Sequence, residues 1–223
     1  RRLSIPAHAA KYNRYQKAKD TMATASLAPS KSEKRIGWIL TAASTIGLFA
    51  SFMLSIEEYL YLQHPSQALS CDINPLIGCG NILSTWQGHI LFGIPNQFFG
   101  LIAFAVLLTI GVLLLSGVKL PVWIWKGLQL GAVAGLLSIF WFMYQSLFVL
   151  NHLCPYCMVT WVATLIISWY ITVHTLQAGI WRLPKWLEKT STFIQKHHLD
   201  ILITIFVVLV ASVLLRFRSF FFG

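Results

Sequence analysis

Charged side chains are scarce in this chain of 223 residues: they make up 11% of the sequence, and only seven are acidic. Soluble domains carry about 25% charged and about 45–50% apolar residues. Here 57% of the residues are hydrophobic and the mean hydropathy is +0.67, so a water-soluble fold of this length could not bury its apolar surface. The same composition excludes intrinsic disorder, collagen and a coiled coil. A membrane protein with several spans is the class that remains.

Long uncharged apolar runs occur four times and predict transmembrane helices. Each run has at least 21 residues, which exceeds the roughly 20 needed to cross about 30 Å of hydrocarbon. A fifth run of 15 residues, bounded by Asp200 and Arg216, can also span if Arg216 snorkels. The sequence therefore predicts an all-α membrane protein, a four-helix transmembrane bundle with a fifth transmembrane helix. The four runs are 36–56, 91–115, 127–150 and 153–176, and the fifth is 201–215.

Lysine and arginine are absent from the segment 57–90. Of the 17 basic residues, nine lie in 1–35, two in 116–126 and four in 177–200, and these segments share one side of the membrane if the runs cross it. Positive residues are enriched in cytoplasmic segments, so we expect a cytoplasmic N-terminus and an outer position for 57–90. The net charge of +10 then faces the anionic inner leaflet, and no nucleic-acid partner is needed to explain it.

This topology divides the chain into five parts. No secretory signal is visible, so the first span is expected to act as its own insertion signal. The N-terminal part is interpreted as a disordered, basic cytoplasmic tail, with a transit-peptide remnant as the alternative. The predicted parts are a tail (1–35), a four-span bundle (36–176) with an outer loop (57–90), a basic cytoplasmic connection (177–200), a fifth span (201–216) and an outer tail (217–223).

The chain has only four cysteines, and all of them fall on the outer side in this topology. Cys71 and Cys79 lie in the long outer loop, whereas Cys154 and Cys157 form a Cys-Pro-Tyr-Cys motif where the fourth run begins. Disulfides form and persist outside the cytoplasm. The distribution therefore indicates thiol–disulfide chemistry at the outer face.

The Cys-Pro-Tyr-Cys motif is predicted to open a helix. Pro155 suits the first helical turn, where its missing N–H leaves no hydrogen bond unmade. Free N–H groups and the helix dipole at that position stabilise a thiolate on Cys154, and Cys-x-x-Cys at a helix start supports thiol exchange. Cys157 lies about 4.5 Å deeper by helix rise, at the edge of the hydrocarbon and within reach of a lipid-soluble oxidant.

The outer pair, Cys71 and Cys79, is of a different kind. Its loop contains Asn74, Pro75 and Gly78, turn-forming residues that predict a flexible segment. A mobile pair beside a membrane-embedded pair can form an electron relay, because thiol exchange proceeds through mixed disulfides. Two alternatives stay open. They are two structural disulfides, to which a Cys-Pro-Tyr-Cys ring adds little loop-closure stabilisation, and a tetrathiolate zinc site, which an oxidising compartment disfavours.

Several short motifs accompany the cysteines in a defined order. They are Glu57-Glu58-Tyr59 at the end of the first span, the Cys71 and Cys79 loop, Ile82-Leu83-Ser84-Thr85, Phe92-Gly93-Ile94-Pro95-Asn96, and Cys154-Pro155-Tyr156-Cys157. Over about residues 36–176 this order resembles the bacterial branch of the vitamin K epoxide reductase family. The other family of quinone-linked bacterial disulfide oxidases places its Cys-x-x-Cys before the widely spaced pair, which is the reverse of the order here.

The resemblance implies a quinone-dependent enzyme that generates disulfides at the outer face of a bacterial plasma membrane. In that family the outer-loop pair, here Cys71 and Cys79, takes electrons from an extracytoplasmic thioredoxin-fold dithiol oxidase. Cys79 would form a transient disulfide with Cys154, and Cys157 would face the quinone, either menaquinone or ubiquinone. The resemblance implies no metal.

The resemblance also implies a set of quinone-binding residues. Asn96 matches the family's asparagine that donates a hydrogen bond to a quinone oxygen, and an amide beside a helix N-terminus can stabilise the charge that develops there. The family's loop serine falls on Thr85, with Ser84 beside it as a competitor. The other residues expected to line the quinone are Leu83, Phe99 and Trp161.

Two departures from the family narrow the expected function. The animal enzymes carry a tyrosine four residues after the second active-site cysteine, where this chain has Trp161, which argues against animal-type epoxide reduction. Many bacterial members continue past a fifth span into a fused thioredoxin domain, whereas the sequence here stops at Gly223. We therefore expect the partner to be a separate chain or a domain that has been removed. The rival functions are a non-catalytic membrane scaffold with two structural disulfides and an animal-like quinone epoxide reductase.

Polar residues on the outer side are given simpler interpretations. Glu57 and Glu58 are expected to be solvated acids at the end of the first span, with proton handling as the alternative. His64, His89 and His152 are expected at the membrane interface, with proton shuttling as the alternative.

Overall fold

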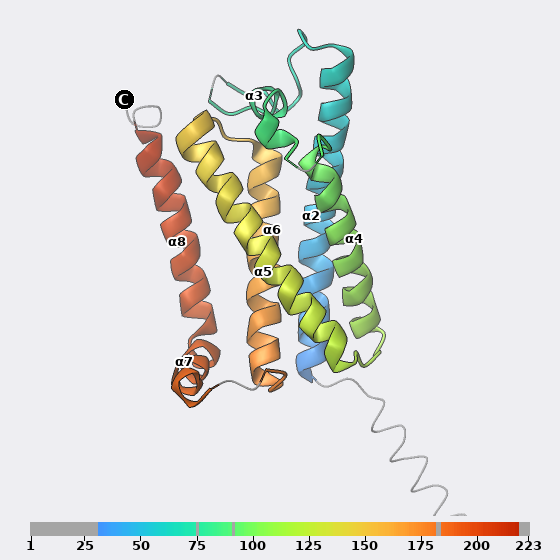
Figure 1. Ribbon diagram of the computed structural model, residues 1–223, viewed down its shortest axis with the longest axis vertical. Coiled ribbons are helices and arrows are strands. Elements are labelled where there is room, and N and C mark those ends of the chain that lie inside the picture. The colour runs from blue at the N-terminus through green and yellow to red at the C-terminus, as the bar shows by residue number, and fades with distance from the viewer. Residues whose placement is uncertain (1–30, 75, 91, 182–183, 219–223) are drawn as a thin grey trace, which may run out of the picture.

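The computed structural model describes residues 31–74, 76–90, 92–181 and 184–218. These residues form an all-α bundle in which five helices are long and apolar enough to cross a membrane (Figure 1), which confirms the predicted fold class. The five are α2 (Lys31–Gln63), α4 (Asn96–Leu115), α5 (Val122–Tyr144), α6 (Pro155–Gln177) and α8 (His198–Arg216). The shorter helices are α3 (Gly80–Leu83), η1 (Trp86–Gly88), η2 (Gln145–Leu150) and α7 (Lys185–Lys196).

The first span is longer than the apolar run that predicts it. α2 begins at Lys31, so residues 31–35 of the expected tail are helical, while residues 1–30 lie outside the described residues. At its other end α2 continues seven residues beyond position 56, to Gln63. Glu57 and Glu58 therefore lie within the helix rather than at its end, and both are buried.

The second span is shorter than its run. α4 begins at Asn96 rather than at residue 91, because Phe92 and Gly93 have positive φ values of 55° and 74°, which the right-handed α-helix excludes. Pro95 supplies the extended residue that precedes the first helical turn. The polar start of α4 is therefore set by a tight turn and not by where the hydrophobic run begins.

Small residues allow close packing between α2 and α4. α2 packs along α4 and α6, and α5 packs along α6 (Figure 1). A Cβ atom added at Gly37 would lie 3.3 Å from the Gly111 carbonyl oxygen, and one added at Gly111 would lie 2.6 Å from Thr41 Oγ1. Membrane helices lack a hydrophobic driving force toward one another, so close backbone approach at small residues is a main source of their association.

α8 is the least enclosed of the five long helices, and most of its apolar side chains are exposed or half-buried. Arg216, at its end, ties it to the turn that precedes α6. The guanidinium donates to the Leu147 carbonyl oxygen at 2.9 Å and to Asn151 Oδ1. The predicted snorkelling arginine therefore also satisfies polar groups of the chain.

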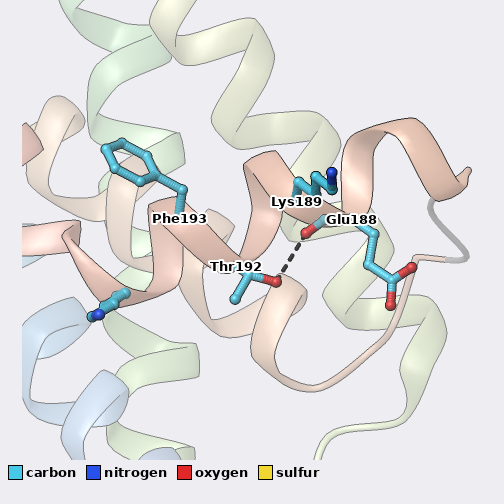
Figure 2. A pocket seen from close by; sticks show the side chains of 5 residues that line it. Glu188, Lys189, Thr192 and Phe193 are labelled. Carbon is cyan, nitrogen blue, oxygen red and sulfur yellow. Dashed lines mark hydrogen bonds between the residues drawn. The ribbon is translucent and has the colours of Figure 1, made fainter.

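The connection 177–200 contains a helix that the apolar runs do not predict. α7 lies at the end of the bundle opposite α3 (Figure 1). A pocket of about 480 Å³ lies along it, and Thr192 Oγ1 donates to the Glu188 carbonyl oxygen there at 2.9 Å (Figure 2). The pocket is lined by Glu188, Lys189, Thr192, Phe193 and Lys196. It contains no cysteine and lies far from the thiol chemistry.

Candidate active site

Backbone pairing joins the outer loop to the turn before α6. Gly78 N–H donates to the Leu153 carbonyl oxygen, and Leu153 N–H donates to the Leu76 carbonyl oxygen, both at 2.9 Å. These bonds surround an isolated parallel bridge. The residues that follow Gly78 and Leu153 are Cys79 and Cys154, so the pairing brings these two cysteines together.

The approach to Cys154 is fixed by an irregular turn. η2 is a π-helix, a form that occurs frequently at functional sites, and it ends at Asn151 in the left-handed conformation (φ 56°). Ser146 Oγ donates to the His152 carbonyl oxygen, and His152 N–H donates back to the Ser146 carbonyl oxygen at 3.2 Å. The turn therefore has little freedom to move the cysteine that follows it.

The four sulfur atoms form a connected series. Cys71 and Cys79 are joined in a disulfide, whereas Cys154 and Cys157 are free thiols. Cys79 Sγ lies 3.6 Å from Cys154 Sγ, and both residues are almost fully buried (0% and 1% exposed). A single thiol–disulfide exchange would convert the Cys71–Cys79 bond into a Cys79–Cys154 bond.

Cys154 occupies the N-cap of α6, and Pro155 is the first helical residue, as the sequence predicts. Cys157 N–H donates to Cys154 Sγ at 3.2 Å. This bond uses one of the four N–H groups that a helix start leaves without a partner. It stabilises negative charge on the sulfur that faces the outer pair.

Asp72 holds the outer pair in place, although no motif in the sequence points to it. Its Oδ1 accepts from Cys79 N–H at 2.8 Å and Gly80 N–H at 3.1 Å, and its Oδ2 accepts from Leu69 N–H at 3.2 Å. Asn74 Oδ1 closes a second turn within the same loop. The loop predicted to be flexible is thus fastened at several points, and its only local sequence signal is an acid directly after Cys71.

Replacement of Asp72 by alanine should loosen the outer pair. Three N–H donors lose their acceptor, and one unsatisfied part-buried donor costs about 1–3 kcal/mol. We expect a lower unfolding temperature in detergent and less contact between Cys79 and Cys154, measured as cross-linking yield in a Cys71→Ser background. Asp72→Asn keeps an oxygen at the Oδ1 position, so its unfolding temperature and cross-linking yield should lie between those of the wild type and Asp72→Ala. Equal stability and equal cross-linking in all three chains would contradict this role.

Cys157 lies against an apolar cluster whose buried residues come from α5 and α6, with Ile205 and Leu209 of α8 packed against it. Trp161, which is 7% exposed, packs in the same cluster. Nearby, the Trp141 ring lies 5.1 Å from that of Phe142 and 6.1 Å from that of Trp86. An apolar and aromatic environment around a thiol fits a quinone ring. Within the described ranges, no three His, Cys, Asp or Glu side chains converge as metal ligands.

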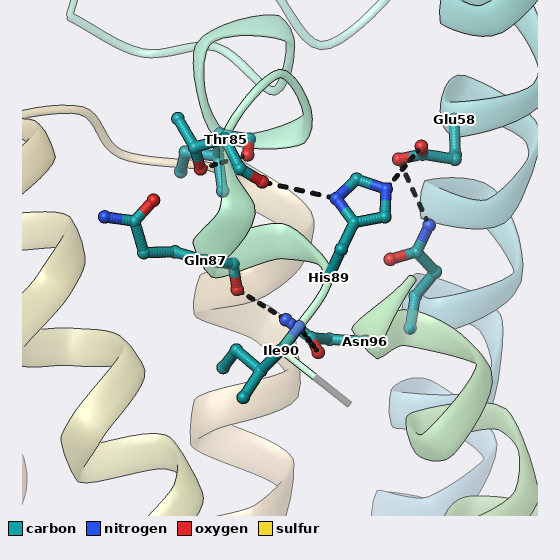
Figure 3. Close-up of polar contacts among 8 residues, drawn as sticks. Glu58, Thr85, Gln87, His89, Ile90 and Asn96 are labelled. Carbon is teal, nitrogen blue, oxygen red and sulfur yellow. Dashed lines mark hydrogen bonds and ion pairs between the residues drawn. The ribbon is translucent and has the colours of Figure 1, made fainter. Parts of the chain in front are cut away.

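Asn96 is bonded to the loop before α4. Its Nδ2 donates to the Gln87 carbonyl oxygen at 2.6 Å, and its Oδ1 accepts from Ile90 N–H at 3.3 Å (Figure 3). One N–H of the amide is therefore engaged within the protein, and an amide nitrogen carries two. The side chain fastens the segment between residues 87 and 90 whatever else it binds.

The other residues expected at the quinone lie in different environments. Leu83 is buried among the cysteines Cys71, Cys79 and Cys154. Thr85 is half-buried and its Oγ1 donates to the Ile82 carbonyl oxygen at 2.7 Å, whereas Ser84 is exposed. Phe99 is 38% exposed on α4 and belongs to none of the buried clusters of the described residues.

The expectation of solvated acids at the end of the first span is wrong. Glu57 and Glu58 are each 3% exposed. Glu57 accepts from the Ser70 N–H at 3.2 Å and from the Ser70 hydroxyl, next to the outer pair. Glu58 instead faces His89, which lies in the loop before α4. Long-range loop contacts bury both acids, and no local pattern reveals such contacts.

A membrane-spanning helical bundle with a disulfide beside a Cys-x-x-Cys dithiol defines a membrane protein of the thiol-oxidoreductase class. The family model described as "Vitamin K epoxide reductase family" matches residues 38–172, more than half of the chain, so the chain belongs to that family. Membership implies a quinone-linked thiol oxidoreductase. No curated protein matches the chain.

Proposed function

We propose that the chain is a quinone-dependent thiol oxidase that reoxidises an extracytoplasmic thioredoxin-fold dithiol oxidase. Electrons would pass from the partner to Cys71 and Cys79, then to Cys154 and Cys157, and finally to a membrane quinone. The observation that carries this proposal is the 3.6 Å distance between Cys79 Sγ and Cys154 Sγ, with Cys79 already in a disulfide.

The outer steps follow from exchange chemistry. A partner thiolate attacks Cys71 Sγ, forms a mixed disulfide and releases Cys79 as a thiolate. The second partner thiol loses its proton to water and resolves the mixed disulfide, which leaves the partner oxidised and Cys71 reduced. Because Cys71 is only 4% exposed, the loop held by Asp72 has to open locally for this attack.

The inner steps use the short sulfur distance. The Cys79 thiolate attacks Cys154 of an oxidised Cys154–Cys157 pair, which forms the Cys79–Cys154 bond and releases Cys157 as a thiolate. Cys71 then attacks Cys79, restores the outer disulfide and releases Cys154. These two exchanges leave the outer pair oxidised and the inner pair reduced, which is the state that the structure contains.

A bound quinone would accept two electrons and two protons, and Cys154 and Cys157 would thereby return to a disulfide. We assign the apolar surroundings of Cys157, with Trp161, to excluding water from this step. Asn96 and Thr85 are assigned to orienting the acceptor, and the exposed Ser84 is the weaker candidate for the loop hydroxyl.

The membrane orientation is part of the same proposal. The basic segments support a cytoplasmic position for the N-terminus and for the connection that contains α7. We assign α3 and the cysteines to the outer face of a bacterial plasma membrane. The thioredoxin-fold partner acts there, as a separate chain or as a domain beyond α8. The redox unit is the four-helix bundle of residues 36–176, and α8 is an added span.

A membrane-impermeant reductant tests orientation and lability together. Added to right-side-out vesicles at low concentration, it should reduce Cys71–Cys79, and peptide mapping should find both cysteines alkylated. A scaffold with structural disulfides would resist, because such bonds exchange poorly with mild reductants. The matched control is the double variant Cys71→Ser, Cys79→Ser, which has no outer disulfide to reduce. Reduction only in inverted vesicles would contradict the orientation, and resistance in both would favour the scaffold.

Asn96→Ala should slow electron transfer from Cys157 to the quinone. Loss of one oxyanion-type donor costs about 10²–10³ in rate, while exchange between the partner and the outer pair should stay unchanged. Stopped-flow measurement of the two half-reactions separates these effects, with Asn81→Ala, an exposed asparagine of α3, as the control. If both halves slow equally, Asn96 serves only to fasten residues 87–90.

A further inference from the structure

α7 is joined directly to a membrane-spanning helix. α7 ends at Lys196 and α8 begins at His198, with a single residue between them. The 19 residues of α8, at about 1.5 Å of rise each, make a helix about 28 Å long, close to the roughly 30 Å of hydrocarbon in a bilayer. The first residue of α8 therefore lies near the edge of the hydrocarbon, and α7 lies at the depth of the lipid headgroups.

α7 also runs across the bundle rather than along it. Figure 1 shows it close to end-on, next to the start of α8, which runs along the bundle. A helix in this direction lies along the membrane surface. Its sequence, KWLEKTSTFIQK, combines lysines with large apolar residues, which is the composition of helices that bind at the membrane interface.

Two lysines and an aromatic residue share one stripe of α7. Lys189, Phe193 and Lys196 stand at positions i, i+4 and i+7, which lie on the same face of a helix. All three are exposed, Phe193 by 59%, and with Thr192 they line the pocket along α7 (Figure 2). Ser191, on the opposite side of the helix, is buried. The stripe therefore faces away from the bundle.

The charges around the stripe leave it positive. Among the described residues, neither Lys189 nor Lys196 forms an ion pair. Asp200, at the start of α8, instead pairs with His197 at 3.1 Å. Glu188 lines the same pocket and supplies one opposing charge, which the dipole favours in the first turn of the helix. Two lysines against one glutamate give this pocket a net positive charge beside an exposed phenyl ring.

We propose that the stripe of Lys189, Phe193 and Lys196 binds the headgroup of an anionic phospholipid. The two ammonium groups attract the phosphodiester, and the Phe193 ring enters the boundary between headgroups and acyl chains. The occupant is a lipid because the stripe lies beside the start of a span, where headgroups surround the protein. This binding does not depend on the redox function proposed above.

Hydrogen exchange of the full chain tests the proposal in nanodiscs that hold one copy each. The discs contain phosphatidylcholine alone or with increasing phosphatidylglycerol in both leaflets, so the result does not depend on orientation. Amide exchange in α7 should slow as phosphatidylglycerol is added. A lysine near an anionic surface is worth about fivefold in affinity, so the double variant Lys189→Gln, Lys196→Gln should weaken the response by about 25-fold.

Two further variants check that charge at the stripe is the cause. Lys34→Gln with Arg35→Gln removes two exposed positive charges from the start of α2, at the same end of the bundle (Figure 1), and should leave the response of α7 unchanged. Glu188→Gln removes the opposing charge and should strengthen the response by about fivefold. Added salt should weaken the response, because it screens exposed charges.

The contrary outcomes are distinct. Equal exchange of α7 in both lipid mixtures, or a phosphatidylglycerol response that the double lysine variant keeps, would overturn the proposal. Slowing by inorganic phosphate in phosphatidylcholine discs would show a site for phosphate ions instead. Slowing that requires two copies in one disc would show a contact between copies, and either result would also overturn the lipid assignment.

Discussion

Cys157→Ser should abolish quinone reduction while leaving exchange at the outer pair intact. In the proposed relay Cys157 is the last sulfur, and serine cannot form the disulfide with Cys154 that releases the electron pair. Removal of a covalent nucleophile can lower a rate by about 10⁶-fold, so the rate should drop to the background of the assay. The measurement is quinone absorbance with a reduced thioredoxin-fold donor, followed by mapping of mixed disulfides between donor and Cys71.

A matched control distinguishes lost chemistry from lost packing. Met158 follows Cys157 in α6 and is partly buried in the same cluster, so Met158→Leu changes a neighbouring side chain at similar volume. It should retain most of the activity. Quinone reduction by Cys157→Ser at more than a trace of the wild-type rate would show that electrons leave from another sulfur.

Cys71→Ser should trap a covalent bond between Cys79 and Cys154. Without Cys71, Cys79 has no partner in its own loop, and the nearest sulfur is Cys154 at 3.6 Å. Backbone bonds of Gly78 and Leu153 hold the two sulfurs together, so the cross-link should dominate after mild oxidation. Digestion without reduction and mass spectrometry should recover one linked peptide pair.

The companion variant, Cys79→Ser, removes the other cysteine of the outer pair. In Cys79→Ser the remaining outer cysteine, Cys71, lacks the close contact with Cys154, so the linked peptide pair should be missing and Cys154 should be found free or bonded to Cys157. A dominant Cys79–Cys157 cross-link in Cys71→Ser would reverse the roles assigned to the two cysteines of α6.

The spans and the start of α6 could be predicted from sequence because their causes are local. Uncharged runs of sufficient length have to be helical in lipid, and Pro155 after Cys154 marks a helix start by its own stereochemistry. The apolar run that begins at residue 91 does not mark the start of α4, because hydrophobicity alone does not register that Phe92 and Gly93 adopt positive φ, whereas Pro95 and Asn96 do mark it. The quinone-side roles of Asn96, Thr85 and Trp161 stay predictions.

The parts of the site that could not be predicted depend on contacts between distant segments. Glu58 and His89 are 31 residues apart, and neither has a neighbour in sequence that signals the pairing. In the sequence Asp72 is an ordinary loop acid, and only the folded structure shows that it accepts a hydrogen bond from the Cys79 N–H. α7 is polar enough to be read as a connection, because an amphipathic helix at the end of the bundle needs only one apolar face.

Reduction of a quinone by the purified chain, with a reduced thioredoxin-fold protein as the sole electron donor, is the decisive measurement. The relay predicts that one quinone is reduced for each donor dithiol oxidised, and that the reaction requires Cys71, Cys79, Cys154 and Cys157 together. Donor oxidation without quinone reduction, or quinone reduction that persists when the outer pair is replaced by serines, would contradict it.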